Sequence, residues 1–121
     1  MILWQKVLEL KTVSEANSSE HWRAKHKRHV IQRNFIRAVF MQDRPEITLP
    51  CKIVLTRVSP RSLDTDNLPC AFKWIRDAIA DLIIPGLAPG RADGDELIEW
   101  VYEQEKQSQR CTKITILTRC E

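Results

Sequence analysis

The sequence predicts a single α/β (α+β) domain spanning residues 1–121, in which two main helices pack on a small mixed β-sheet of about four strands. Three observations support this fold class. The chain of 121 residues has the length of one domain. Its hydrophobic content of 43% is enough for a packed core and argues against disorder. Its strand-like and helix-like segments follow one another in the order β-α-β-α-β-β, without internal repeats.

The first half of the chain contains a strand and a long basic helix. Apolar residues in partial alternation predict the strand over residues 2–11, and a polar loop follows. Asn17 and Glu20 have the spacing of a capping box, which predicts a helix over about residues 18–41. One stripe of this helix is apolar at helical spacing: Ala24, Ile31, Phe35, Ala38 and Val39. The opposite stripe is basic and has Trp22 and Phe40 on the same side: His26, His29, Arg33 and Arg37.

The second half of the chain contains three further strands and one amphipathic helix. A β-branched run predicts a strand over residues 51–59. The next helix is expected over residues 68–84, with this buried stripe: Leu68, Phe72, Ile75, Ile79 and Leu82. The segment PGLAPGRADGD holds all three glycines of the chain and is expected to be a loop. Strands over residues 97–103 and 113–118 complete the order.

The charged residues are unevenly distributed along the chain, although the formal net charge is only +3. Residues 21–37 contain six Lys or Arg residues and no acid, whereas residues 93–105 contain six acids and no Lys or Arg. This separation suits a protein that binds a polyanion and also has a cation site. The simpler alternative, which charge counts alone favour, is that both segments are solvated surfaces.

Several classes of protein do not fit the sequence. The longest apolar run is too short for a membrane span. The N-terminal segment lacks the basic start and the cleavage site of a signal peptide. There is no CxxC pair and no His at zinc-finger spacing, so we expect no structural zinc. We expect a cytoplasmic protein with four reduced thiols: Cys51, Cys70, Cys111 and Cys120.

The segment LDTDN at residues 63–67 admits two interpretations. Asp66 suits a helix start, because Asp is a preferred N-cap residue. Pro69 falls in the first turn, where a backbone N–H has no partner within the helix and its absence costs nothing. On this motif alone, capping is the simpler interpretation. Capping needs one acid, however, and Asp64 adds like-charge repulsion unless a cation offsets it. Carboxylates are ligands that Mg²⁺ accepts together with water and substrate phosphates, so a metal site is the second interpretation.

Two further groups extend the metal hypothesis. Lys73 follows Asp66 on the polar side of the helix, and its side chain leans back toward a phosphate that such a metal would hold. The alternative is a surface pair of Lys73 with Asp77, worth a few tenths of a kcal/mol at most. Asp93 and Asp95 lie in a Gly-containing segment that forms either an ordinary turn or a source of a third carboxylate.

Four segments in this order resemble the RusA-like family of Holliday junction resolvases, and the resemblance covers most of the chain. The first is similar to the "HW" segment and basic helix of phage-encoded members: SEANSSEHWRAKHKRHVIQR. The second resembles the family's Asp-x-Asp-Asn-Leu motif: LDTDNL. The third and fourth are similar to the helix after that motif and to the paired-Asp turn before a strand: FKWIRDAIADL and ADGDELIEWVY.

The resemblance implies a homodimeric endodeoxyribonuclease that depends on Mg²⁺, with Mn²⁺ as a substitute, and resolves branched DNA in recombination, repair or phage DNA processing. It implies metal binding by Asp64, Asp66 and either Asp93 or Asp95, and catalytic roles for Asp64, Asp66, Asp93 and Lys73. The family's lysine stands four residues after the second Asp, where this chain has Cys70. Lys73 instead keeps the four-residue spacing to Asp77.

The basic helix is expected to contact DNA phosphates through six residues: Lys25, His26, Lys27, His29, Arg33 and Arg37. Two alternative functions stay open. One is a protein that binds branched DNA without cutting it, in which Cys70 marks a lost lysine. The other is a structural or partner-binding protein whose acids only cap helices and keep the chain in solution.

Overall fold

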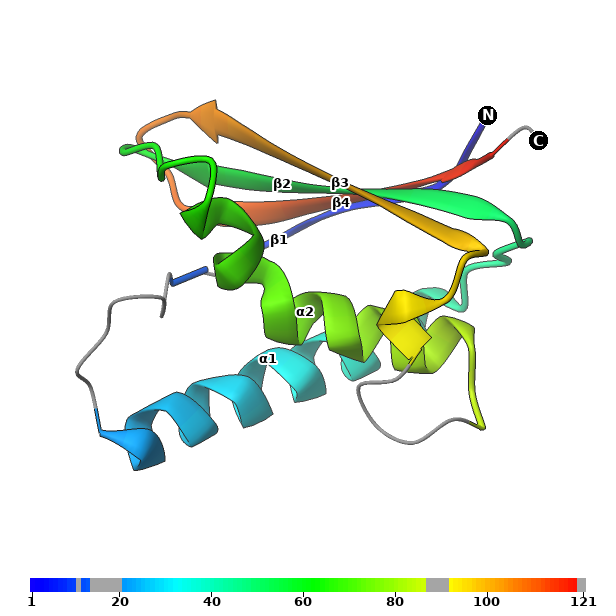
Figure 1. The fold of residues 1–121 in the computed structure, drawn as a ribbon, viewed down its shortest axis with the longest axis horizontal. Helices are drawn as coiled ribbons and strands as arrows, with labels where there is room; N and C mark the ends of the chain where they lie inside the picture. Colours follow the sequence, from blue (N-terminus) through cyan, green and yellow to red (C-terminus); the bar gives the residue numbers. More distant parts are fainter. Residues whose placement is uncertain (11, 14–20, 87–91, 120–121) are drawn as a thin grey trace.

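The computed structural model describes residues 1–10, 12–13, 21–86 and 92–119 and confirms the predicted α+β fold (Figure 1). The elements follow in this order: β1 (Ile2–Leu8), α1 (Trp22–Asp43), β2 (Cys51–Ser59), α2 (Asn67–Ile83), the short 3₁₀ turn η1 (Ala92–Gly94), β3 (Ile98–Lys106) and β4 (Cys111–Thr118). None of the helices in these ranges is long and apolar enough to cross a membrane. Cys51, Cys70 and Cys111 are free thiols, whereas Cys120 lies outside the described residues.

The sheet is mixed, with the strand order β1-β4-β2-β3. β4 runs antiparallel to both of its neighbours, β1 and β2. β2 and β3 are parallel, with Ile53 opposite Trp100. A parallel pair needs a long crossover connection, and α2 provides it. β3 is therefore an edge strand that is connected to the rest of the sheet through β2 alone.

Both helices lie on one face of the sheet (Figure 1). Alternate residues of a strand point to opposite faces, so Cys51, Ile53 and Leu55 of β2 point toward the helices and are fully buried. Further side chains of the core come from α2 and β4: Phe72, Ile75, Ile79, Ile114 and Ile116. The open face of the sheet carries charged side chains such as Glu99 and Glu103, which are exposed.

The rotation of α1 about its axis differs from the sequence prediction. Its buried residues are Gln32 and Ile36. Three residues of the predicted apolar stripe are instead exposed: Ala24, Ile31 and Ala38. The prediction is wrong for these three because apolar residues occur around most of the helix, so the pattern does not select one stripe.

Contacts with β1 fix the rotation of α1. The rings of Phe40 and Trp4 meet edge to face with centroids 5.0 Å apart. The Trp4 indole N–H donates to Asp43 Oδ2 at 3.1 Å, and Lys6 Nζ lies 3.2 Å from the same oxygen. These partners are more than thirty residues away in sequence, which is why the pattern of α1 alone could not reveal them.

The termini of the elements also differ from prediction at several points. β1 ends at Leu8, before the predicted residue 11. α1 begins at Trp22, and the N-cap is His21, whose Nδ1 accepts from the Arg23 backbone N–H at 3.1 Å. The capping box of Asn17 and Glu20 lies outside the described residues. β3 continues beyond the predicted residue 103, and β4 begins before the predicted residue 113.

The buried stripe of α2 is largely as predicted. Leu68, Phe72, Ile75 and Ile79 are buried, and Leu82 is 36% exposed near the C-terminal end of the helix. Because this stripe packs on β2 and β3, the opposite, polar side of α2 is turned outward.

Candidate functional site

The loop that precedes α2 carries Asp64 and Asp66, and a side chain of β3 holds it in place. The Leu63 backbone N–H donates to Gln104 Oε1 at 3.0 Å, and Gln104 Nε2 donates to the Leu63 carbonyl at 2.8 Å. The Asp64 carbonyl accepts from the backbone N–H groups of Asn67 and Leu68, at 2.9 and 3.1 Å. The carboxylates of Asp64 and Asp66 are exposed. The backbone of this loop is therefore anchored while both acids reach solvent.

Asp66 occupies the N-cap position of α2, but its side chain makes no capping hydrogen bond. Its backbone angles, φ −69° and ψ −30°, are helical, whereas an N-cap residue usually has an extended backbone. The capping interpretation therefore does not account for this carboxylate. The positive end of the α2 dipole still favours a negative charge here.

Asp93 is held against α2 and β3 by Arg76. One terminal nitrogen of the Arg76 guanidinium donates to the Asp93 carbonyl at 3.0 Å, and the other donates to the Tyr102 hydroxyl at 2.7 Å. Arg76 Nε lies 3.2 Å from Asp93 Oδ2 but is not aligned for a hydrogen bond. The guanidinium also lies over the Trp100 ring, whose indole N–H donates to the Asp93 carbonyl at 3.0 Å. Arg76 and Trp100 thus hold η1 on the polar side of α2, and Tyr102 orients Arg76.

The carboxyl group of Asp77 on α2 lies near enough to that of Asp93 for the two to interact electrostatically. Burial raises the pKa of Asp77 to about 6, with a further contribution from the negative charge of Asp93. The charge of Asp81 adds to the rise in pKa, and the Lys73 ammonium opposes it. A cation bound beside these two carboxyl groups would offset the same repulsion that a proton on Asp77 relieves.

Lys73 is exposed on α2 one turn before Asp77. Its ammonium lies 5.1 Å from the centre of the Trp74 ring. Trp74 also contacts α1, because its ring stacks on the ring of His29 with centroids 3.9 Å apart. The polar side of α2 is therefore joined to α1 at the position of His29.

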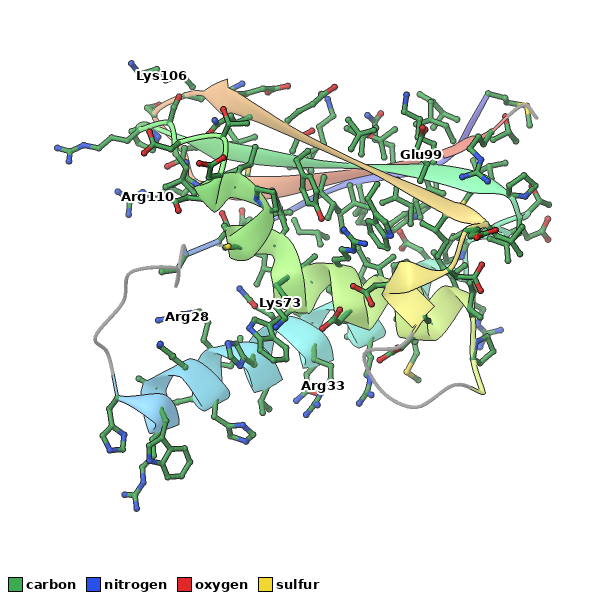
Figure 2. All side chains as sticks on the ribbon, in the orientation of Figure 1. Arg28, Arg33, Lys73, Glu99, Lys106 and Arg110 are labelled. Carbon is green, nitrogen blue, oxygen red and sulfur yellow. The ribbon has the colours of Figure 1, made fainter. Side chains whose placement is uncertain are left out.

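The basic residues of α1 lie on the flank next to α2. His26 and Arg33 are neighbours of His29 on the helix surface, at spacings of three and four residues, and Arg37 lies one turn further on. These three are exposed, whereas His29 is partly buried by the stack. Figure 2 shows Lys73 on α2 and Arg33 on α1 in the same region. The flank of α1 formed by His26, Arg33 and Arg37 is called the basic flank below.

Three other predicted residues, Lys25, Lys27 and Asp95, lie outside the basic flank and the Asp77–Asp93 pair. Lys25 is partly buried, and Lys27 lies on a different side of α1, beside Leu10. Asp95 Oδ1 accepts from the Leu97 backbone N–H at 2.9 Å, so this carboxylate stabilises the turn before β3. Of the two acids in that turn, Asp93 is the one that contacts α2.

The structure divides the predicted metal ligands between two positions. Asp66 and Asp77 are eleven residues apart on α2, or about 16 Å at 1.5 Å per residue. Within the described ranges, no three His, Cys, Asp or Glu side chains stand close enough together to hold one metal ion. Each position offers two carboxylates at most. Mg²⁺ is commonly bound by one or two carboxylates, with water and substrate phosphates as its other ligands, so this donor set fits it.

Sequence reasoning missed three residues that organise these positions: Asp77 as the partner of Asp93, Arg76 and Gln104. Arg76 directly precedes Asp77 on the helix, but the sequence gives no sign that it contacts Asp93. Trp100, Tyr102 and Gln104 alternate along β3 and share the face toward α2. That alternation was visible in the sequence, but the partners of these side chains were not.

Comparison of the chain with protein-family models, with curated proteins and with solved structures finds no match.

Proposed function

We propose that this protein is a Mg²⁺-dependent, structure-selective endodeoxyribonuclease that cuts branched DNA, with four-way junctions as the substrate class. One observation carries the proposal: the carboxyl pair of Asp77 and Asp93 lies beside Lys73, and the stack of Trp74 on His29 joins this position to the basic flank of α1. A polyanion that binds the basic flank would pass next to carboxylates suited to a hard cation. The resemblance to RusA-like resolvases supports the same reaction.

Distinct roles follow for the residues of the site. Asp77 and Asp93 would hold a Mg²⁺ ion, and Asp64 and Asp66 form a second carboxylate position at the start of α2. When bound, the ion supplies a more acidic water molecule and neutralises charge on the phosphate. Lys73 offers an exposed ammonium to a phosphate oxygen. Arg76 is a positioning residue, because its donors are directed at Asp93 and Tyr102.

The decisive experiment compares nicking of a labelled four-way junction by the wild type and by Asp93→Asn and Asp66→Asn. Each variant removes one negative charge with little change in shape, so we expect both to fold and to lose Mg²⁺-dependent nicking. Glu99→Gln is the matched control, because it removes an exposed carboxylate from the open face of the sheet. Nicking by Asp93→Asn at the wild-type rate would exclude Asp93 from the metal site. If only Asp66→Asn is inactive, the metal belongs at the start of α2.

The basic flank can be tested by the salt dependence of junction binding in EDTA, where no cutting occurs. Each phosphate that a protein neutralises contributes about −0.9 to the slope of log K against log salt for duplex DNA. Changing Arg33 and Arg37 together to Ala should therefore flatten the slope by about one to two units. An unchanged slope would place the basic flank away from the DNA.

A second candidate function is binding of branched DNA without catalysis. It is favoured by the separation of about 16 Å between the two carboxylate positions and by Cys70 at the position of the family's lysine. Junction binding without nicks in either Mg²⁺ or Mn²⁺ would select this function.

We propose that the protein acts as a homodimer in the cytoplasm of a bacterial or phage-infected cell. Symmetric cutting of two opposed strands needs two sites related by a two-fold axis. Exposed apolar surface on α1 supports a second copy: Ile31 is 52% exposed and lines a groove of about 540 Å³ with Leu10 and Phe35. Light scattering that detects only the 14.1 kDa species, with and without DNA, would contradict the dimer.

A further inference from the structure

A second pocket lies at the end of the sheet next to the loop that carries Asp64. It has a volume of about 430 Å³, within the range of small-ligand sites. Its walls come from the end of β2, the loop before α2 and the start of β4. The polar side chains that line it are three arginines and three hydroxyls: Arg57, Arg61, Arg110, Thr12, Ser59 and Ser62. None of these residues belongs to the nuclease site described above.

Among the described residues, no ion pair neutralises the three arginines. Within the part of the chain that the structure describes, ion pairs join Lys6 to Asp43 and Arg76 to Asp93, and none involves these arginines. Arg57 donates from a terminal nitrogen to the Arg61 carbonyl at 2.5 Å, while its Nε is buried without a hydrogen-bond partner. A buried donor without a partner costs about 1–3 kcal/mol, more when it is charged. The positive charge of the Arg57 guanidinium would be stabilised by an anion in the pocket that this residue lines.

The electrostatics of the pocket support the same ligand. Burial lowers the pKa of the Arg57 guanidinium, and the nearby positive charge of Arg110 lowers it further. Positive charges that are brought together without an acid repel one another, and an oxyanion relieves this repulsion. Phosphate has several oxygens that can accept from guanidinium groups in a bidentate manner and from hydroxyls.

We propose that Arg57, Arg61 and Arg110 form a binding pocket for a phosphate group of the DNA strand that runs past Asp64. This inference rests on the proposed function and adds a fixed point for the substrate strand. Leu63 lines the pocket and directly precedes Asp64, and consecutive Cα atoms are about 3.8 Å apart. A strand whose phosphate occupies the pocket would therefore pass close to Asp64. The pocket therefore sets the register of the strand on the protein.

The first test measures binding of a labelled four-way junction in EDTA as a function of salt. Arg61→Gln and Arg110→Gln are the informative variants, because both side chains are exposed and their loss leaves the core intact. One phosphate contact contributes about 0.9 to the slope of log K against log salt. Between 1 M and 0.1 M salt, this contact therefore strengthens binding about eightfold. We expect each variant to weaken binding about eightfold at 0.1 M salt and to flatten the slope by about one unit.

The matched control is Arg44→Asn. Arg44 is the exposed C-cap residue of α1 and has a left-handed backbone with φ 47° that Asn adopts readily. The C-terminal end of α1 lies away from the start of α2, next to which the pocket is formed (Figure 1). Arg44→Asn removes one positive charge, as Arg61→Gln and Arg110→Gln do. If only general electrostatic attraction acts, all three variants should lose the same junction affinity. A specific pocket predicts that Arg44→Asn binds like the wild type. Equal losses in the three variants would overturn the proposal.

The second test uses inorganic phosphate as the probe and needs neither DNA nor Mg²⁺. The Nε–H signal of Arg57 in ¹⁵N NMR spectra should shift on titration with phosphate and should not respond to chloride at the same ionic strength. The signal is assigned by its loss in Arg57→Lys, and Arg110→Gln should abolish the response. An Arg57 signal that phosphate leaves unchanged would overturn the proposal.

The outcomes separate the two inferences. If no condition gives nicking but phosphate shifts the Arg57 signal and the pocket variants bind DNA weakly, the proposed nuclease fails and the phosphate pocket stands. If nicking depends on Asp93 but the pocket variants bind and cut as the wild type does, the nuclease stands and the pocket proposal is wrong.

Discussion

Replacement of Asp77 by Asn should stabilise the protein at neutral pH. The folded state raises the pKa of Asp77 from its ordinary value of 3.8 to about 6, chiefly by burial. At about 1.4 kcal/mol for each pH unit, this rise corresponds to about 3 kcal/mol of unfolding free energy. Asp77 is partly exposed and water screens its charge, so the measurable part is about 1 to 2 kcal/mol.

The direction of the pH dependence follows from the raised pKa. Between pH 4 and pH 6 the folded state keeps the proton of Asp77 and the unfolded state has lost it. The free energy of unfolding of the wild type should therefore fall as the pH rises through this window, and the stability contribution is fully present only below about pH 4. In Asp77→Asn this part of the pH dependence should disappear, leaving the variant more stable than the wild type at pH 7.

The assay is urea unfolding of both proteins at intervals from pH 4 to pH 7.5 without divalent ions. Asp64→Asn is the control, because it removes an exposed carboxylate outside the Asp77–Asp93 pair. It should show the same pH dependence as the wild type. Parallel stability curves for Asp77→Asn and the wild type would refute the raised pKa of Asp77 as an energetic feature of the fold.

Four further predictions concern the same region. Mg²⁺ at ten times its dissociation constant should raise the unfolding free energy of the wild type by about 1.4 kcal/mol and leave Asp77→Asn unchanged, as differential scanning fluorimetry with Ca²⁺-free buffers can measure. Arg76→Lys keeps the charge but cannot contact Asp93 and Tyr102 at once, so thermal unfolding should show about 1–3 kcal/mol less unfolding free energy. Unaltered stability would mean that the contacts of Arg76 with Asp93 do not stabilise the fold. Gln104→Ala removes both hydrogen bonds to Leu63 and should cost about 1–2 kcal/mol by the same measurement, with increased amide exchange at Leu63 and not at Ile53. Asp66→Asn should melt within about 0.5 kcal/mol of the wild type, because no capping hydrogen bond is lost, and a larger loss would restore the capping role.

The parts of the fold that were predictable from the sequence are those encoded by local patterns. The run of residues 51–59 gave the bounds of β2 correctly, because its β-branched residues are typical of a strand. The apolar spacing of α2 likewise gave most of its buried stripe and, with it, the exposed position of Lys73. The position of Asp64 and Asp66 directly before this helix also followed from the sequence.

The parts that were not predictable depend on contacts between distant segments. The interaction of Asp77 with Asp93 joins two elements that are distant in sequence, and spacing in the sequence does not encode such a contact. The convergence of Arg57 with Arg110 depends on sheet register, because Arg57 lies opposite Thr112 on β4. A shift of the β2–β4 register by one residue would turn Arg57 to the other face of the sheet, away from Arg110. The rotation of α1 was missed for the same reason, since distant residues of β1 determine it.

The position of β4 in the middle of the sheet has a consequence for how the chain folds. β2, α2 and β3 follow one another in sequence and contain both carboxylate positions, so their contacts can form without the first strand. β1, in contrast, pairs with the strand at the other end of the chain, and such distant pairings form slowly because a long loop must close first. During synthesis we therefore expect β1 to stay unpaired until β4 has emerged from the ribosome. Changes in β1 should alter how much protein reaches the folded state, while the protein that does fold keeps the geometry of its acidic residues.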